Sequence, residues 1–456
     1  MPTKDIAAII LAAGKGTRMK SPLPKVLHEV AGWSLLRHAM SAALALKPVR
    51  VMTVVGENME AVQAEARAVY SDVECVVQEK QLGTGHAVRQ AMPKLKTFKG
   101  TVLVLYADTP LIRPETLKKL VASLEKQKAA VAVLGFEAGD AAEYGRLVTE
   151  GGNLLEIVEH KDATAEQRAL TLCNSGVMAI SGAKATELLG ALTNKNAKGE
   201  YYLTDVVKIA RGKDYGYTWV RAEEAEVLGV NSQAERAAAE TRMQEHMRRE
   251  AMAGGVMLVA PETVFFAADT KLATGVKVEP YVVFGVGVKV EAGVEIRAFS
   301  HITGAHIRKN AVVGPFARLR PGADIGEDAK IGNFVEIKQA KLHKGVKASH
   351  LTYIGDAEIG AESNLGAGTV TCNYDGYNKH RTEIGAEVFI GSNTSLVAPV
   401  KIGDGAIVGA GSTITKDVDP DARAINKMPQ ENTPGRGGAI RKLQEKKAGA
   451  KGKNYL

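Results

Sequence analysis

Residues 307–337 read IRKNAVVGPFARLRPGADIGEDAKIGNFVEI, and they set the architecture expected for the C-terminal half of the chain. An aliphatic side chain recurs there at every sixth position, namely Ile307, Val313, Leu319, Ile325, Ile331 and Ile337. The same period runs through residues 276–294 and 384–414. A period of six fits neither a helix nor a simple strand, but it is typical of the hexapeptide β-helix, in which each unit is one short strand and a corner. We therefore expect a left-handed parallel β-helix over residues 253–430.

The six-residue period is interrupted in a few places. Val294 and Ile307 are thirteen residues apart, one more than two repeats, and two later spacings shrink to five. Residues 371–383, TCNYDGYNKHRTE, contain no aliphatic side chain that could point inward. We expect this stretch to leave the coil as a loop, and loops on a rigid scaffold are where functional groups concentrate.

Residues 1–230 follow a different rhythm, in which short valine-rich runs alternate with helix-period stretches. The apolar runs are residues 6–11, 49–55, 73–77, 102–106 and 131–135. Helical periodicity appears between them, for example at 35–46 and 114–126. This order predicts a Rossmann-like α/β domain with a mostly parallel sheet. Residues 231–252 are almost all strong helix formers, so we expect a linker helix that joins the two domains.

The composition of the 456-residue chain fits two or three globular domains, because 45% apolar and 24% charged residues exclude a mainly disordered or fibrous chain. The net charge is +8, but residues 434–456 alone hold seven Lys or Arg against one Glu, which is +6. We therefore expect residues 431–456 to be a basic flexible tail. Aromatic side chains that could stack on bases are scarce in it, so we expect no specific nucleic-acid partner.

The three cysteines, Cys75, Cys173 and Cys372, lie far apart, form no CxxC pair and are odd in number. This pattern argues against a disulfide framework and against a four-cysteine zinc site. No apolar run approaches the roughly 18 residues of a membrane span. The first residues also lack the pattern of a secretory signal. Together these features predict a cytoplasmic protein.

A glycine loop follows the first expected strand. Residues 11–19 read LAAGKGTRM, and Lys25 comes shortly after. Gly14 and Gly16 would let the backbone approach a ligand closely. Arg18 and Lys25 would add the positive charge that a polyphosphate needs, so the loop is expected to bind phosphate. The spacing matches neither a Walker A loop nor the GxGxxG dinucleotide fingerprint, and the alternative is an ordinary glycine turn.

Two motifs resemble those of the sugar-nucleotide pyrophosphorylases. LAAGKGTRM…PLPKVL is similar to the signature of that family, and QEKQLGTGHA at residues 78–87 is similar to its base-recognition segment. Together with the long hexapeptide region, residues 5–430 resemble a bacterial family of bifunctional N-acetylglucosamine-1-phosphate uridylyltransferase/glucosamine-1-phosphate N-acetyltransferases. The basic tail lies outside this resemblance.

Asp108 follows the strand expected at residues 102–106, at the edge where parallel sheets hold their ligands. By itself, it could hold Mg²⁺ or simply cap a turn. The resemblance implies that Asp108 and Asn231 bind Mg²⁺, and that Arg18 and Lys25 are catalytic, neutralising charge during transfer. It also implies a site for UTP and the sugar that comprises Leu11, Ala12, Ala13, Gly14, Lys25, Gln78, Gly83, Thr84, Tyr106, Gly145, Glu159, Asn174 and Asn231.

His350 is the candidate base of the C-terminal half, because a histidine can take the proton of an attacking amine near pH 7. A lone histidine is otherwise often structural. The resemblance implies that His350 is the general base of an acetyl transfer. It assigns binding of the sugar phosphate to Arg320, Lys338, Tyr353 and Asn364. It assigns binding of acetyl-CoA to Ala367, Asn373, Tyr374, Ser392, Ala410 and Lys427.

Two positions depart from the pattern of that family. Ala107 stands where glycine is usual, which adds one methyl group beside the sugar site. Lys427 stands where arginine is usual, so the charge is kept but the bidentate contact to a CoA phosphate is lost. Cys372 lies beside Asn373 but has no evident activating partner, and we interpret it as a bystander.

The resemblance implies two consecutive reactions. The C-terminal half would acetylate glucosamine-1-phosphate with acetyl-CoA. The N-terminal half would then transfer uridylyl from UTP to N-acetylglucosamine-1-phosphate, releasing pyrophosphate and forming UDP-N-acetylglucosamine for peptidoglycan and lipopolysaccharide synthesis. It also implies a homotrimer. Two other hypotheses stay open: a single-activity sugar-1-phosphate nucleotidyltransferase, such as a glucose-1-phosphate adenylyltransferase, and a β-helix that serves only oligomerisation or docking.

Overall fold

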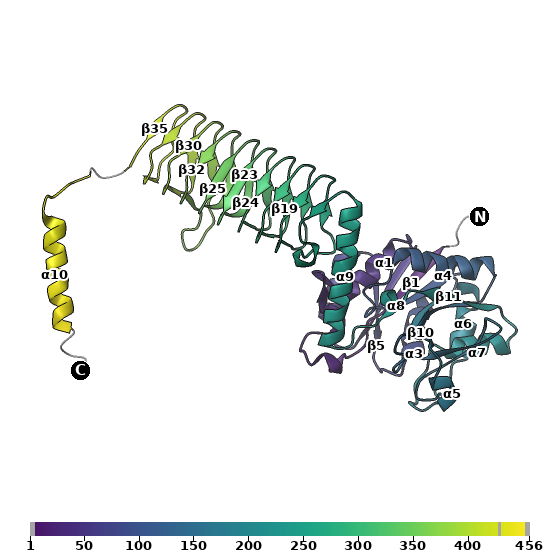
Figure 1. Cartoon of the computed structure of the whole chain (residues 1–456). Coiled ribbons are helices and arrows are strands. Elements are labelled where there is room, and N and C mark those ends of the chain that lie inside the picture. The colour runs from purple at the N-terminus through teal and green to yellow at the C-terminus, as the bar shows by residue number, and fades with distance from the viewer. Residues whose placement is uncertain (1–4, 427–429, 452–456) are drawn as a thin grey trace. The chain divides into compact units, whose positions relative to one another are not determined.

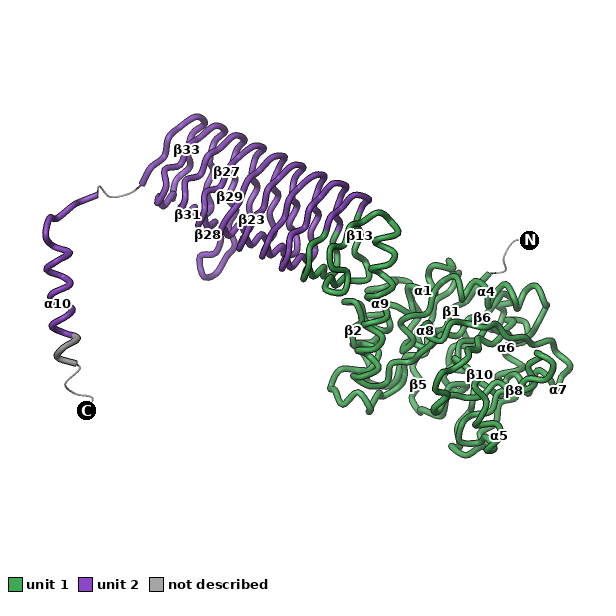
Figure 2. Tube along the Cα trace, in the orientation of Figure 1, with its two compact units in different colours: residues 1–272, 278–288 green, residues 273–277, 289–456 purple. Residues whose placement is uncertain are grey.

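The computed structural model describes residues 5–426 and 430–451. The chain divides into two compact units (Figure 2). The N-terminal unit comprises Met1–Leu272 with Val278–Val288, and the C-terminal unit comprises Ala273–Lys277 with Lys289–Leu456. Within the described ranges, no helix is both long enough and apolar enough to cross a membrane.

The N-terminal unit is built on a nine-stranded sheet whose main path runs β11-β7-β10-β6-β1-β4-β5. Figure 1 labels β1, β5, β10 and β11 of this sheet. The bounds are β1 Ile6–Leu11, β4 Arg50–Gly56, β5 Glu74–Gln78, β6 Thr101–Tyr106, β7 Val131–Glu137, β8 Arg146–Glu150, β9 Asn153–Val158, β10 Leu172–Ser181 and β11 Tyr217–Ala222. Strand β1 pairs in parallel with both β4 and β6, so the carboxyl ends of these strands meet at one edge. Strand β10 runs antiparallel to β6 and β7. The mostly parallel α/β domain that the sequence predicts is therefore confirmed.

Helices cover both faces of this sheet, and successive residues of β1 pack against opposite layers. Ile10 joins the apolar cluster of α1 (Leu35–Leu44), α2 (Glu60–Val69) and α4 (Pro114–Lys126). Ile9 joins the cluster of α3 (Thr84–Ala91), α6 (Gly182–Gly190) and α7 (Asp205–Gly212). A strand that is buried on both faces needs apolar residues at every position, which explains the continuous run in the sequence.

Helix α9 (Gln233–Ala253) is the helix that the sequence predicts at residues 231–252, and it begins with a capping box formed by Ser232 and Glu235. It does not behave as an isolated linker. Glu240 accepts a hydrogen bond from the backbone N–H of Ala31 at 2.7 Å. Gln244 is buried and bonds both backbone groups of Phe266. These contacts place α9 within the N-terminal unit.

The C-terminal unit is a stack of coils made of short parallel strands. Its ladders include β17 Glu295–Ile296, β20 Val312–Val313, β21 Arg318–Leu319, β22 Ala323–Ile325, β23 Lys330–Asn333, β24 Glu336–Leu342, β25 Lys347–His350, β26 Tyr353–Ile359, β27 Asn364–Leu365, β28 Val370–Cys372, β29 Thr382–Ile384, β30 Phe389–Ile390, β31 Ser395–Val397, β32 Val400–Ile402, β33 Ile407–Val408 and β34 Thr413–Ile414. Ile307 pairs with Ile325, and Ile325 pairs with Leu342. One coil therefore takes 18 or 17 residues, as three hexapeptides require, and the predicted parallel β-helix is confirmed.

The inward column of the first coils differs from the prediction by two residues. The strands there point Val278, Phe284, Val290, Ile296 and Ile302 inward. The series that begins at Val276 lies just before each strand and is also buried, so it shows the same period. The next inward residue after Ile302 is Ile307, five positions later. The irregular spacing of thirteen between Val294 and Ile307 in the sequence is therefore a single spacing of five, instead of six, along the inward column.

The loop predicted at residues 371–383 is shorter in the structure. Thr371 and Thr382 stay in the coil, on β28 and β29, with buried side chains. A threonine fills nearly the volume of a valine, and the Thr371 hydroxyl accepts a hydrogen bond from the backbone N–H of Gly355 at 2.8 Å. A polar residue can therefore replace the inward aliphatic side chain, and the loop comprises residues 373–381.

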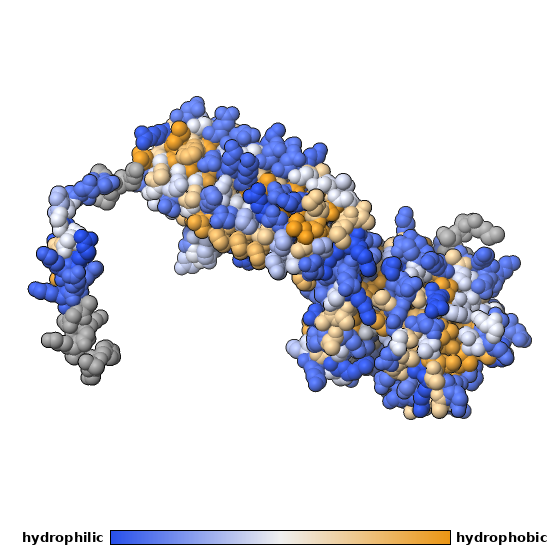
Figure 3. All heavy atoms as spheres, in the orientation of Figure 1, coloured by the Kyte–Doolittle hydropathy of each residue, from blue (hydrophilic) through white to orange (hydrophobic). Residues whose placement is uncertain are grey.

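Part of the basic tail is helical. Residues Arg436–Lys451 form helix α10, and nearly all of its described side chains, at 436–447, are exposed. Figure 3 shows its hydrophilic surface. Lys, Arg, Ala, Leu and Gln favour helix, and this propensity outweighs the two glycines that follow Arg436.

Candidate active sites

A cavity of about 330 Å³ lies at the carboxyl ends of β1, β5 and β6. Its lining includes the predicted residues Leu11, Ala12, Ala13, Gly14, Lys25, Gln78, Gly83, Thr84, Tyr106 and Asp108. These residues come from separate segments, and they meet because β1 lies between two parallel neighbours whose carboxyl ends share one edge.

Lys25 connects the two predicted metal ligands. Its Nζ lies 2.5 Å from Oδ2 of Asp108 and donates a hydrogen bond to Oδ1 of Asn231 at 3.1 Å. The backbone N–H of Val230 donates to the carbonyl of Asp108 at 2.8 Å, which fixes the two segments to each other. A carboxylate oxygen and an amide oxygen thus converge on one positive charge. This donor set fits a divalent cation whose other ligands are substrate phosphates and water.

Two glycines shape the segments around this cavity, and Gly83 is one of its lining residues. Gly16 has φ of +63°, and a Cβ there would overlap the Cβ of Lys25. Gly83 has φ of +102°, and a Cβ there would lie 2.7 Å from the carbonyl oxygen of Tyr201. The carbonyl of Gly83 accepts a hydrogen bond from Nε2 of the buried Gln78 at 3.2 Å. Glycine is therefore required at both positions for steric as well as conformational reasons.

The remaining predicted sugar-site residues form a second group beside Tyr106. The backbone N–H of Asn174 donates to the carbonyl of Gly145 at 2.8 Å. Oδ1 of Asn174 accepts from the N–H of Gly176 at 3.1 Å, and Gly176 packs so closely on the Tyr106 ring that a Cβ there would clash with it. Gly145 in turn faces the carboxyl group of Glu159. These residues adjoin the cavity through Tyr106.

Burial raises the pKa of two of these groups. It raises the pKa of Glu159, although Thr204 donates a hydrogen bond to its carboxylate at 3.0 Å and opposes the shift. Burial also raises the pKa of the Tyr106 hydroxyl well above its ordinary value, so Tyr106 stays neutral. A neutral hydroxyl and a buried carboxyl group are both suited to hydrogen bonding with the hydroxyl groups of a sugar.

Arg18 is the one member of the predicted basic pair that does not line the cavity. It lies exposed on the short 3₁₀ turn Thr17–Met19. Four lining residues are not among the predicted site residues, namely Val26, Gln81, Ala87 and Glu200. Gln81 donates a hydrogen bond to the carbonyl of Ala13 at 2.5 Å. It lies inside the base-recognition motif, and this position is the signal that identifies it as a candidate site residue. Glu200 lines the cavity from a distant segment that carries no motif.

His350 lies at the end of β25, where its Nδ1 is 2.7 Å from Oδ1 of Asn333. Asn333 is the register partner of His350 on the neighbouring strand β23. In the neutral ring, an accepting Oδ1 of Asn333 is matched by a proton on Nδ1, and this tautomer leaves Nε2 as the acceptor. Asn333 is not among the predicted site residues, although the spacing of one 17-residue coil identifies it once the register is known.

The predicted base and three predicted acetyl-CoA residues lie along one edge of the β-helix. The register pairs Ala348 with Leu365, Leu365 with Ile390, and Ile390 with Val408. Each of these four residues is followed, two positions later, by one predicted site residue: His350, Ala367, Ser392 and Ala410, in the same order. They therefore occupy equivalent corners of four successive coils.

Other predicted acetyltransferase residues lie on the adjacent face. Arg320 donates a hydrogen bond to Glu336 at 2.9 Å, so its guanidinium is held by a carboxylate. Lys338 pairs with Gly355 on the next strand. The Tyr353 hydroxyl and the Asn373 amide both lie against Gly355, where a Cβ would clash with them. The face thus brings together two cations and two polar groups, as a sugar phosphate requires.

The last predicted residues are more scattered. Asn364 pairs with Lys347 in the sheet that contains His350. Tyr374 is exposed on the loop 373–381, with the Lys379 ammonium 4.4 Å from its ring. Lys427 lies outside the residues that the structure describes.

Comparison with known proteins assigns both halves to transferase families. Residues 8–201 match the MobA-like NTP transferase domain, and residues 304–339 and 381–416 match the bacterial transferase hexapeptide (six repeats). The bifunctional protein GlmU of Zymomonas mobilis is 52% identical over 431 residues, which cover 94% of this chain and 96% of that protein.

Two further relatives give the same result. The bifunctional protein GlmU of Azorhizobium caulinodans and that of Ruegeria sp. are each 52% identical, over 446 and 447 residues, and each comparison covers 98% of this chain and 99% of the relative. With matches of this length and identity, the chain belongs to the family of bifunctional GlmU proteins, and it is a transferase.

Proposed function

We propose that the two halves catalyse consecutive steps in the synthesis of UDP-N-acetylglucosamine. The C-terminal half transfers the acetyl group of acetyl-CoA to glucosamine-1-phosphate. The N-terminal half transfers uridylyl from UTP to N-acetylglucosamine-1-phosphate and releases pyrophosphate. The observation that carries the proposal is the convergence of Asp108 and Asn231 on Lys25, in a cavity lined by the residues expected to bind UTP. Acetyl-CoA and UTP are cytoplasmic metabolites, so the proposal also places the chain in the cytoplasm.

In the N-terminal half, the protein mainly positions the substrates and neutralises their charge. The phosphate oxygen of the sugar phosphate attacks the α-phosphorus of UTP, a new P–O bond forms, and the bond to pyrophosphate breaks. Asp108 and Asn231 would hold Mg²⁺, which supplies charge neutralisation at the phosphates. Lys25 supplies a second positive charge at the cavity, and Arg18 acts from the exposed turn. Gln78 and the backbone at Gly83 would contact the base.

In the C-terminal half, His350 acts as the general base. The amine nitrogen of the sugar attacks the thioester carbonyl, its proton passes to Nε2 of His350, and the thiolate of CoA leaves. The hydrogen bond from Nδ1 to Asn333 supports this role, because it leaves Nε2 free to accept a proton. Arg320 and Lys338 would hold the phosphate of the acceptor. Ala367, Ser392 and Ala410 would contact acetyl-CoA along the same edge.

A homotrimer follows from the same proposal. Phe299, Phe316 and Phe334 stack in successive coils, with ring centroids 4.9 and 5.2 Å apart, and each is about half exposed. Leu351 continues this apolar column and is adjacent in sequence to His350. We expect other copies of the chain to cover the column and to complete the acetyltransferase site. Light scattering after gel filtration should give a mass three times the 48.4 kDa of one chain.

The proposal is tested by following free thiol and pyrophosphate in one reaction. The purified protein is supplied with glucosamine-1-phosphate, acetyl-CoA, UTP and Mg²⁺. We expect thiol to appear first and pyrophosphate to follow after a lag. Pyrophosphate that forms only when N-acetylglucosamine-1-phosphate is supplied, with no thiol at any time, would reduce the β-helix to a scaffold.

A further inference from the structure

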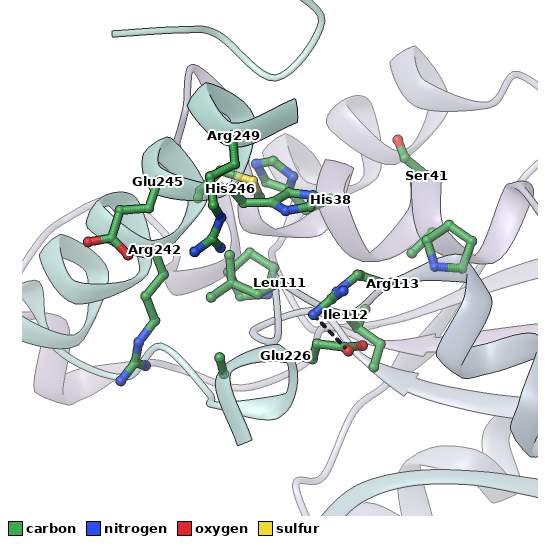
Figure 4. A pocket seen from close by; sticks show the side chains of 15 residues that line it. His38, Ser41, Leu111, Ile112, Arg113, Glu226, Arg242, Glu245, His246 and Arg249 are labelled. Atoms are coloured by element: carbon green, nitrogen blue, oxygen red, sulfur yellow. Dashed lines mark ion pairs between the residues drawn. The ribbon is translucent and has the colours of Figure 1, made fainter. Parts of the chain in front are cut away.

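A second cavity, of about 480 Å³, lies within the N-terminal unit and contains none of the predicted site residues (Figure 4). Helix α1 contributes His38 and Ser41 to it, and helix α9 contributes the segment from Arg242 to Arg249. The remaining walls are the loop 110–114, which follows β6, and the short helix α8 (Glu224–Val227). Its volume falls in the range of small-molecule sites, roughly 300–1,000 Å³.

The lining combines apolar surface with unpaired positive charge. Leu111, Ile112 and Met243 supply apolar side chains. Arg242 and Arg249 project from α9, the helix that also contributes Met243 (Figure 4). Both arginines are exposed to solvent, and neither guanidinium has a hydrogen-bond or ion-pair partner among the residues that the structure describes. Arginines beside an apolar wall are suited to a ligand with an anionic group on an apolar body.

The other titratable groups of the lining do not cancel this charge. Glu226 is buried and paired with Arg113, its Oε1 lying 3.1 Å from Nη2. Burial lowers the pKa of His38, whose Nε2 bonds the backbone carbonyl of Val30 at 2.8 Å, so this ring is neutral. His246 lies 3.6 Å from Glu250 on its own helix. Glu245 is the remaining carboxylate of the lining, against the two arginines of α9.

The cavity adjoins both segments that carry the proposed metal ligands. Arg113 lies five residues after Asp108, and Glu226 lies five residues before Asn231. The Arg113–Glu226 ion pair joins these segments on the cavity side. The hydrogen bond from the N–H of Val230 to the carbonyl of Asp108 joins them beside the metal ligands. A ligand in the cavity would therefore contact the two chain segments that carry Asp108 and Asn231.

We propose that this cavity is a regulatory site for a small organic anion with an apolar body, and that its occupant alters uridylyl transfer by shifting the segments of Asp108 and Asn231. Arg242 and Arg249 bind the anionic group, and Leu111, Ile112 and Met243 contact the apolar body. The effect on transfer rests on the function proposed above, whereas binding itself does not.

The probe for binding is 1-anilinonaphthalene-8-sulfonate, whose fluorescence rises in apolar sites. Its neutral analogue, N-phenyl-1-naphthylamine, has the same rings without the sulfonate. Both are titrated into the full-length protein, the variant Arg249→Gln and the control variant Arg211→Gln. Arg211 is an exposed arginine of α7 that lies outside this cavity. Circular dichroism melts show whether each variant is folded.

We expect saturable binding of the sulfonate to the parent protein and to Arg211→Gln. Arg249→Gln should weaken it roughly tenfold, as loss of one charge-assisted contact does, and should leave binding of the neutral analogue unchanged. Equal sulfonate affinity in Arg249→Gln and Arg211→Gln, both folded, overturns the site. If Arg249→Gln does not fold, Arg242→Gln takes its place.

The regulatory effect is measured as pyrophosphate release at subsaturating Mg²⁺, with and without the sulfonate. We expect the sulfonate to change the Mg²⁺ concentration for half-maximal rate by at least threefold in the parent protein and in Arg211→Gln, but not in Arg249→Gln. Binding that leaves this concentration unchanged overturns the regulatory role. A protein that releases no pyrophosphate under any condition contradicts the proposed function instead, while the fluorescence titration still reports on the site.

Discussion

The two units assemble their candidate sites by different geometric rules. In the N-terminal unit, residues from distant segments converge at one sheet edge, and Lys25 reaches Asn231 across 206 positions of sequence. In the C-terminal unit, the corresponding residues are separated by whole coils and stack in a column along one edge. The first site depends on chain topology, and the second depends on repeat length. Changes in the two sites should therefore have separable consequences.

The largest expected effect is the loss of acetyl transfer, without loss of uridylyl transfer, when His350 is replaced. Replacing His350 by alanine removes the base, so acetyl transfer should fall by roughly 10²- to 10⁴-fold. Uridylyl transfer to supplied N-acetylglucosamine-1-phosphate should not change. Thiol release and pyrophosphate release measure the two activities separately. His343→Ala is the matched control, because His343 pairs with Glu358 on another face of the β-helix. A normal rate of thiol release in His350→Ala would mean that another group is the base.

Asp108→Asn should produce the reciprocal pattern. The substitution removes the negative charge that holds the cation and pairs with Lys25, so pyrophosphate release should fall by about a hundredfold, while thiol release is retained. The exposed Asp72→Asn serves as control. Full activity of Asp108→Asn at ordinary Mg²⁺ would contradict the role of Asp108 in the metal site.

A matched pair of threonines tests the interior of the β-helix. Thr371→Val removes the acceptor of the Gly355 N–H and should lower the free energy of unfolding by about 1–3 kcal/mol. Thr382→Val should be neutral or stabilising, because the hydroxyl of Thr382 is buried with no partner among the described residues. Thermal and denaturant melts of both variants make the comparison, and the opposite order would contradict it.

Two glycines of the phosphate loop make the equivalent comparison in the N-terminal unit. Gly16→Ala should lower the free energy of unfolding by about 1–2 kcal/mol, because the left-handed backbone is strained for alanine and the new Cβ overlaps Lys25. Gly14→Ala should leave stability unchanged, since nothing lies within 4 Å of its Cβ position. Equal melting temperatures for the two variants would show that the loop adjusts without cost.

The smallest effect concerns Asn333, which positions His350. Asn333→Ala should lower kcat of acetyl transfer about fivefold, the worth of one exposed hydrogen bond of about 1 kcal/mol. The pH profile of kcat should also shift, because the ring loses its fixed tautomer. Asn333→Asp keeps an acceptor at the same place and should restore most of the rate. Identical pH profiles for Asn333→Ala and the parent protein would mean that this hydrogen bond is only structural.

The fold of each half is predictable because each half has a regular sequence pattern. Apolar runs alternate with helical segments in the first half, and an aliphatic side chain recurs at every sixth position in the second. Buried strands such as β1 need apolar residues throughout, and the coils need one aliphatic side chain in six, so both patterns are visible without a structure. The period does not fix the register of the first coils, because Val276 and Val278 are both buried and the period alone does not show which of the two lies on the strand. Thr371 and Thr382 fall within the predicted loop because neither is aliphatic, and the prediction requires an aliphatic side chain at each inward position.

Site residues that belong to a local sequence motif are predictable, whereas those that only the fold brings to the site are not. Motif residues such as Gly83 and Lys25 line the cavity as expected. Glu200 was missed because only the fold brings it there, and no local pattern marks it. Asn333 was missed because its partner His350 lies one coil away, a distance that has meaning only once the 17-residue register is known. Tertiary convergence and exact register are thus the two properties that a local motif does not contain.

The central claim, that each half contains its own active site, is tested most directly by mixing His350→Ala with Asp108→Asn. Glucosamine-1-phosphate, acetyl-CoA, UTP and Mg²⁺ are added, and pyrophosphate is followed over time. The account predicts that neither variant alone releases pyrophosphate at an appreciable rate, and that the mixture does so after a lag. The acetylated intermediate made by one variant can diffuse to the other. A mixture as inactive as the two separate variants would contradict two independent sites.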